Sequence, residues 1–259
     1  MRRTPQDDVV ASVRDACTRL RWHPALRRGW DVARVEADVR AASAGAALDG
    51  ARVPPARVRE LASGASPQGP DEAVARAGLR VRAAVTRGWS GPTAPLPKVP
   101  LGQLVVSLHV AAGGDGRLRV ADQPGDLRGL GEAPVGPRLG GALVELADLV
   151  GGSAGTSGLE TAAAALAQLS LLRPFRDHNA VVARAVFRWV TITSGLDPSG
   201  LAMPEVAWAQ DPQGFLGTLA GASTAAGWRP WVQRCADALL GGAQAAHVVA
   251  DDVAAGRLT

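Results

Sequence analysis

Two apolar segments joined by a short polar loop constrain the fold of this chain more than any other feature. The first apolar segment spans residues 162–172, and the second runs from about 181 to 194. Ser157 and Glu160 stand at the spacing of a capping box just before the first segment. We therefore expect two buried helices with well-defined ends, connected by the polar loop of residues 173–180.

The composition favours the same class of fold. Apolar residues make up 47% of the sequence, but it contains only 3 Phe, 2 Met and no Tyr, so the core must consist of small aliphatic side chains. Such side chains favour close-packed helices over a β-sandwich. Apolar residues three and four apart, as at Val9, Val13, Ala16 and Leu20, extend the helical pattern towards the N-terminus.

The domain organisation follows from the same pattern. We predict an all-α chain with an N-terminal helical region over residues 1–96, a core over 97–245 and a C-terminal tail over 246–259. The proline-rich residues 88–97 are the best candidate for a boundary. Residues 113–137 contain many glycines and prolines and are expected to be mainly loop, with Leu118–Val120 as a short strand of a β-hairpin.

Charge, cysteines and segment lengths exclude several classes of protein. The net charge is +4 and the pI about 10.2, but the arginines are scattered among acidic residues, which does not favour nucleic acid as a partner. Cys17 and Cys235 have no metal-like or redox-like spacing. The sequence shows neither a signal peptide nor an apolar run of roughly 20 residues, so we expect a soluble, cytoplasmic protein without a membrane partner.

The polar loop holds the residues with the clearest chemistry. Arg173, Arg176 and Arg184 accompany the exposed N–H groups of a helix N-terminus, which is a suitable site for an anion, and Asp177 could hold a divalent cation that bridges phosphate oxygens. The alternative is a plain helix-loop-helix turn in which Asp177 or Asn179 caps the second helix and the arginines face solvent. These local features leave both interpretations open.

The loop also resembles the signature of the Fic/Doc (Fido) family of nucleotide-transferring proteins. That signature is His-x-Phe-x-Asp/Glu-Gly-Asn-Gly-Arg-x-x-Arg, and residues 173–184 align with it without a gap. Phe175, Asp177, Asn179 and Arg184 match it. The resemblance implies a helical bundle with a central helix-loop-helix and a small hairpin flap, and a site for ATP and Mg²⁺ or for another phosphate-bearing ligand.

Four positions depart from this signature. Arg173 stands where the family has the histidine that acts as general base, and arginine is not deprotonated in proteins. His178 and Ala180 replace the two glycines, and Val181 replaces the first arginine, which removes a cation from the phosphates. His178 is a weak candidate for a substitute base, because a helix-capping or packing role explains it more simply.

A second, weaker resemblance lies upstream. Residues 45–50, Gly-Ala-Ala-Leu-Asp-Gly, are similar to the inhibitory-helix motif Ser/Thr-x-x-x-Glu-Gly/Asn of the same family. The family's Glu pairs with the second arginine of the signature and blocks nucleotide placement. The resemblance therefore implies a pair between Asp49 and Arg184, although Asp is one methylene shorter.

Three functions fit these residues. The favoured one is a degenerate Fic protein without ordinary AMP-transferase activity, which retains a nucleotide- or anion-binding loop or binds a protein partner as a pseudoenzyme. The second is an active transferase with an altered donor or acceptor, and the third is an antitoxin-like regulator of another Fic protein. The implied site residues are Arg173, His178, Asn179 and Arg184 for the anion, Asp177 for the metal and Asp49 for inhibition.

Overall fold

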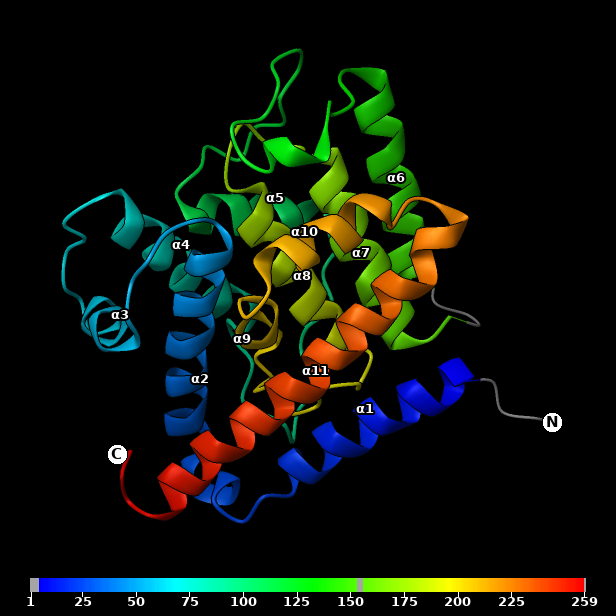
Figure 1. Cartoon of the computed structure of the whole chain (residues 1–259). Coiled ribbons are helices and arrows are strands. Elements are labelled where there is room, and N and C mark those ends of the chain that lie inside the picture. Colours follow the sequence, from blue (N-terminus) through cyan, green and yellow to red (C-terminus); the bar gives the residue numbers. More distant parts are fainter. Residues whose placement is uncertain (1–4, 153–155, 259) are drawn as a thin grey trace.

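Helices form most of the chain. The computed structural model describes residues 5–152 and 156–258, and Figure 1 shows how the helices are arranged. In chain order they are α1 (Pro5–Arg21), α2 (Leu26–Leu48), α3 (Pro55–Ala62), α4 (Pro70–Val85), α5 (Leu101–Ala112), the 3₁₀ turn η1 (Arg128–Leu130), α6 (Pro137–Gly151), α7 (Gly158–Leu172), α8 (Asn179–Thr193), α9 (Pro204–Trp208), α10 (Pro212–Gly221) and α11 (Ala225–Ala254).

The two predicted central helices are α7 and α8, and both begin where the sequence indicates. Ser157 caps α7 by accepting a hydrogen bond from the N–H of Glu160, and the Glu160 carboxylate accepts one from the N–H of Ser157, both at 3.2 Å. Helix α8 packs against α4, α5 and α7 and is buried on almost every side. The loop between α7 and α8 is therefore fixed at both ends by buried helices.

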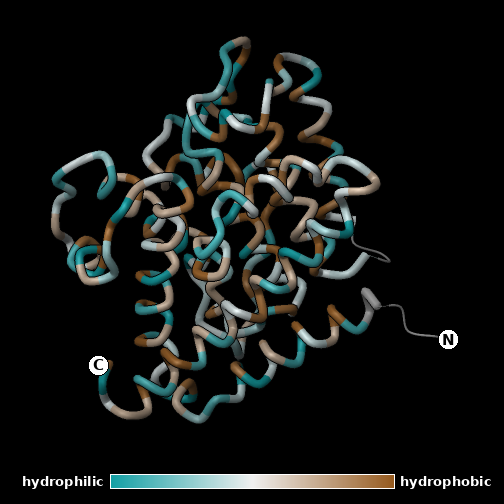
Figure 2. The backbone as a smooth tube through the Cα atoms, in the orientation of Figure 1, coloured by the Kyte–Doolittle hydropathy of each residue, from teal (hydrophilic) through white to brown (hydrophobic). Residues whose placement is uncertain are grey.

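One hydrophobic core joins the beginning, middle and end of the described chain. It includes Val13 of α1, Trp30 of α2 and Trp89, which lies in the proline-rich segment, together with residues of α7, α8 and α11. Peripheral helices such as α1 alternate hydrophobic and hydrophilic positions, as Figure 2 shows. The last helix, α11, continues to Ala254 and so includes most of the predicted C-terminal tail. No helix in the described ranges combines the length and apolarity that crossing a membrane requires.

The predicted β-hairpin is wrong. Residues 113–136 form no strand in the described structure, and their only regular element is the η1 turn. The N–H of Arg119 donates to the carbonyl of Pro174 at 2.9 Å, and the buried Arg119 side chain donates to the carbonyls of Leu172 and Arg173. The segment therefore pairs with the polar loop after α7 instead of with a second strand of its own.

The buried face of α2 includes charged side chains. Val35 is exposed, whereas the carboxylates of Glu36 and Asp38 are buried. Arginines of other elements reach both carboxylates, and a paired charge tolerates burial far better than an isolated one.

Candidate functional site

The polar loop is shaped by two residues with left-handed backbone conformations. Arg173 ends α7 with φ of 44°, and His178 precedes the first residue of α8 with φ of 57°. Such conformations usually require glycine, but histidine adopts them more readily than most residues. Between them Phe175 is buried, and its ring stacks on the ring of His109 with centroids 3.8 Å apart. The loop is therefore anchored to α5 by this stack.

Arg173 does not face the loop's outer surface. Its side chain is buried, with the residue only 1% exposed, and its guanidinium donates to the carbonyls of Leu127 at 3.0 Å and Gly131 at 2.8 Å. Burial, together with the nearby charge of Arg119, lowers the pKa of Arg173. In this conformation the arginine at the family's histidine position fastens a neighbouring loop segment. Its role in binding an anion stays a prediction.

The N-terminus of α8 already holds a carboxylate. Asp126 accepts a hydrogen bond from the side-chain amide of Asn179 at 2.7 Å and one from the N–H of Ala180 at 3.0 Å. The other contacts of Asn179 are with the N–H and C=O of Phe175, at 2.8 and 2.9 Å. A helix N-terminus with free N–H groups attracts anions, and here the carboxylate of Asp126 is the anion that accepts from them.

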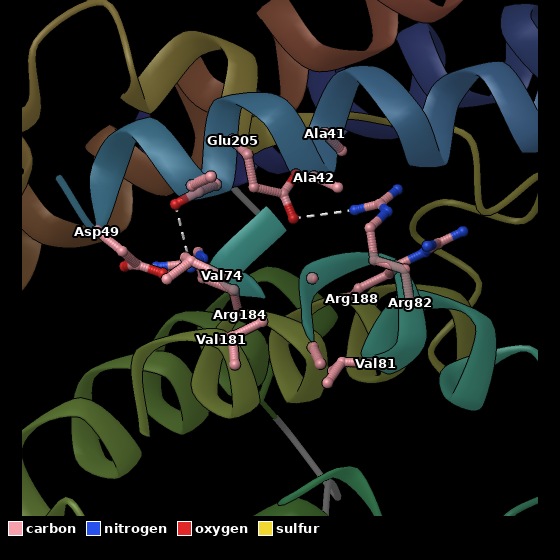
Figure 3. Close-up of a pocket in the computed structure, with 14 residues that line it drawn as sticks. Ala41, Ala42, Asp49, Val74, Val81, Arg82, Val181, Arg184, Arg188 and Glu205 are labelled. Atoms are coloured by element: carbon pink, nitrogen blue, oxygen red, sulfur yellow. Dashed lines mark hydrogen bonds and ion pairs between the residues drawn. The ribbon is translucent and has the colours of Figure 1, made fainter. Parts of the chain in front are cut away.

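Arg184, one helical turn further along α8, also holds a carboxylate. Its two terminal nitrogens lie 2.9 and 2.6 Å from the two carboxylate oxygens of Asp49, which follows the last turn of α2 (Figure 3). Burial alone would lower the pKa of Arg184, but Asp49 outweighs this effect and raises it. The contact that the resemblance implied is thus present, despite the shorter side chain of Asp49. Its inhibitory role stays a prediction.

A network of buried charges lies behind this pair. Asp38 of α2 accepts hydrogen bonds from Arg82 at 2.8 Å and from Arg188 at 2.7 Å. Glu205 accepts another from Arg82 at 2.9 Å (Figure 3). The adjoining cavity of about 20 Å³ is large enough for one water molecule. Arg82, Arg188 and Glu205 each keep one buried polar atom without a partner in the described structure, so a bridging water is expected there.

The loop opens onto a cleft of about 610 Å³. Its lining includes the carboxylates of Asp49, Asp126 and Asp177, together with His178 and Arg128. Carboxylates outnumber cations in this lining, which disfavours a polyanionic ligand in the present conformation.

Asp177 lies between two histidines. Its Oδ1 is 3.4 Å from Nε2 of His109 and 3.8 Å from Nε2 of His178. The N–H of Gly116 donates to Nδ1 of His109, so Nε2 of that ring carries the proton and points towards Asp177. Burial lowers the pKa of His109, which keeps the ring neutral. Asp177 itself is 63% exposed at its side chain and faces the cleft.

The structure brings some of the predicted site residues together and separates others. Asp49, Asp177 and His178 share the cleft, Asn179 and Arg184 lie beside it with their polar groups bound to carboxylates, and Arg173 points away. Sequence reasoning missed Asp126, because a single acid in a glycine-rich loop carries no periodic or motif signal. It also missed the Asp38 network, whose members come from four separate helices.

Several solved structures share the architecture of this chain. A Fic family protein from Desulfovibrio desulfuricans G20 matches with a TM-score of 0.72 at 17% identity, over 97% of this chain and 77% of that chain. A Fic domain containing signaling protein from Bacteroides thetaiotaomicron VPI-5482 matches with a TM-score of 0.69 at 15% identity, over 94% of this chain and 98% of the other. Fic-1 from C. elegans matches with a TM-score of 0.67 at 19% identity, over 93% and 71% of the two chains. No family model and no curated protein matches the sequence significantly.

Proposed function

Because the chain has the Fic fold, we propose that it is a Fic-type protein that does not carry out ordinary AMP transfer and acts through binding. The observation that carries this proposal is the state of Arg173. It stands at the position of the family's general base, it is buried, and it donates to the backbone carbonyls of Leu127 and Gly131. A guanidinium so placed cannot accept a proton from a target hydroxyl.

The missing base limits the rate. A positioned general base contributes about 10² to 10⁴ in rate, so AMP transfer at this loop would be slower by roughly that factor. No other residue at the end of α7 replaces it, since Pro174 and Phe175 have no titratable group. The chemical step is therefore impaired even where a nucleotide binds.

The groups that would bind phosphates are engaged as well. Arg184 is paired with Asp49, and the amide of Asn179 and the N–H of Ala180 are bonded to Asp126. A Mg²⁺ ion would fit Asp177 only together with phosphate oxygens, because the described residues contain no cluster of three or more ligating side chains. We infer that the protein in this conformation binds neither ATP nor Mg²⁺ strongly, and that its partner is a protein or a ligand that first opens the site.

The test is an AMP-transfer assay with ATP labelled at the α-phosphate, in the presence of Mg²⁺, on the protein itself and on a cell lysate. We expect no labelled product from the wild type and none from Asp49→Ala, in which Arg184 is released but the base is still absent. Labelled protein from Asp49→Ala would mean that the chain has a working base, and the proposal would then be wrong. Arg173→His combined with Asp49→Ala shows whether the remaining site supports transfer once a histidine is supplied.

A second candidate function is transfer of a different phosphate-bearing group, with His178 as the base. The observation in its favour is that His178 lines the cleft, with its Nε2 3.8 Å from Oδ1 of Asp177. The test is a panel of nucleotides and phosphorylated small molecules with Mg²⁺, followed by mass spectrometry of protein and products. A product that Arg173→Ala still forms and His178→Ala does not would favour this candidate over the first.

A further inference from the structure

The segment of residues 119–131 is fastened to the polar loop from both sides. Arg119 donates to the carbonyls of Leu172 and Arg173, and the N–H of Gly125 donates to the carbonyl of Arg176 at 2.6 Å. In the opposite direction Arg173 donates to the carbonyls of Leu127 and Gly131. Asp126 lies between Gly125 and Leu127, so the contacts on both sides of it set the position of its carboxylate.

We propose that Asp126 is a built-in competitor for the anion site at the N-terminus of α8, and that Arg173 is the positioning residue that holds it there. This inference rests on the proposed function and adds a regulation to it. A phosphate group reaches the N–H of Ala180 and the amide of Asn179 only when the segment carrying Asp126 lifts away. Arg173 stands where the family has its general base, so its presence removes the base and also fastens the segment that covers the anion site.

The bonding pattern of Asp126 is that of a bound anion. Its two oxygens accept from two different donors, one a side-chain amide and one a backbone N–H at the first turn of α8, at 2.7 and 3.0 Å. Asn179 is itself buried, so its amide has no access to bulk water as a substitute partner. A tetrahedral phosphate presents oxygens of the same charge and can make the same two bonds.

The backbone around this contact is strained on both sides. Within the described ranges, the non-glycine residues with positive φ are Leu127 at 52°, Arg173 at 44° and His178 at 57°. Leu127 follows Asp126 directly, and the other two begin and end the polar loop. Left-handed conformations of such residues are strained and cluster at ligand clamps and switch regions. The strain at Leu127 lowers the stability of the closed segment, so it makes opening of the segment easier.

Tethering explains how the Asp126 carboxylate can exclude a free phosphate ligand that binds the same N–H groups more tightly. An internal group competes at an effective concentration in the millimolar range for short flexible connections, and a fastened segment raises it further. A free phosphate ligand must exceed this value before it displaces the carboxylate. Removing Asp126 should therefore convert the N-terminus of α8 into an open anion site.

The experiment compares thermal unfolding of the wild type, Asp126→Ala and Asp122→Ala in inorganic phosphate and in potassium chloride of equal ionic strength. Asp122 is the matched control, because it lies on the same segment, its side chain is 69% exposed, and the arginine that it pairs with, Arg176, is exposed as well. Loss of the Asp126 bonds should lower Tm by about 3–10 °C. Phosphate should raise the Tm of Asp126→Ala saturably, and by more than it raises the Tm of the wild type and of Asp122→Ala, which respond only to the general stabilising effect of phosphate.

Hydrogen exchange gives a second measurement at the proposed site. The amide of Ala180 should be protected in the wild type, exchange faster in Asp126→Ala, and regain protection in phosphate. If Asp126→Ala does not fold, Asp126→Asn keeps the side-chain volume without the charge and should show the same response. In Arg173→Ala, Asp126 is still present but is no longer held in place. Phosphate should therefore displace it and change the exchange rate of the Ala180 amide in this variant.

Two results would overturn the inference. In the first, phosphate changes neither the Tm nor the Ala180 exchange of the Asp126 variants. In the second, phosphate changes them in the wild type as strongly as in the variants. Neither result depends on nucleotide or on transfer. AMP transfer by the wild type would instead contradict the proposed function and leave the phosphate response of Asp126→Ala intact.

Discussion

Asp38 should be the most sensitive single position for the stability of this fold. The residue is 6% exposed and its carboxylate is shared by the buried guanidiniums of Arg82 and Arg188. In Asp38→Asn the volume is unchanged but one negative charge is lost. Arg82 keeps Glu205, whereas Arg188 keeps only the carbonyl of Gly200, at 2.8 Å. The variant thus contains a buried cation without a carboxylate.

The magnitude follows from this unpaired charge. Breaking a buried ion pair by removing one partner costs about 3–5 kcal/mol. For a chain of this size each kcal/mol lowers Tm by about 2–4 °C, so the expected loss is about 6–20 °C. Thermal unfolding followed by circular dichroism, with urea unfolding as an independent measure of the free energy, gives the value directly.

Glu60→Gln is the matched control for Asp38→Asn. Glu60 also pairs with an arginine, Arg57, but its side chain is 61% exposed. Exposed pairs contribute about 0–1 kcal/mol, so Tm should change by no more than about 4 °C. If Asp38→Asn loses no more stability than Glu60→Gln, then Asp38 does not balance the charge of the buried arginines.

Three further predictions concern the same elements. Asp49→Ala should lower the free energy of unfolding by about 2–4 kcal/mol, because it leaves Arg184 buried without its carboxylate, and Asp49→Glu should restore most of the loss in urea unfolding. Ser157→Ala should cost about 1 kcal/mol by removing the cap of α7, measured in the same way, and a stability equal to the wild type would show that the capping box is dispensable. Burial alone would raise the pKa of Asp38, but Arg188 and Arg82 hold it below its ordinary value of 3.8, so the stability that it contributes is present above that value and is lost as pH falls through the lower folded-state pKa. Acid titration of the unfolding free energy should therefore show a steeper fall below about pH 4 in the wild type than in Asp38→Asn.

The helices were predictable because their signals are local. Ser157 and Glu160 marked the beginning of α7. The apolar runs on either side of the polar loop became α7 and α8 within a few residues of the predicted bounds. The Fic fold itself followed from the few matching residues of that loop, and the solved structures confirm it.

The contacts that close the site were not predictable, because they join residues far apart in the sequence. Asp126 meets Asn179 across 53 positions, and nothing in its surroundings distinguishes it from other loop acids. Arg119 was assigned to a strand because Leu118 and Val120 flank it, yet its side chain is buried among carbonyls of the polar loop. Charge counts along a sequence do not show which arginines share a carboxylate, and therefore the Asp38 network became visible only in three dimensions.

We infer that the phosphate site of this Fic-type loop is filled by the protein's own carboxylates, Asp49 and Asp126. A calorimetric titration of Mg²⁺–ATP into the wild type, repeated with Arg184→Ala, tests whether the site is closed. We expect no saturable heat at millimolar nucleotide in either protein. Saturable binding by the wild type that Arg184→Ala abolishes would contradict the claim, because it would show that the phosphate site is open while Asp49 and Asp126 are both present.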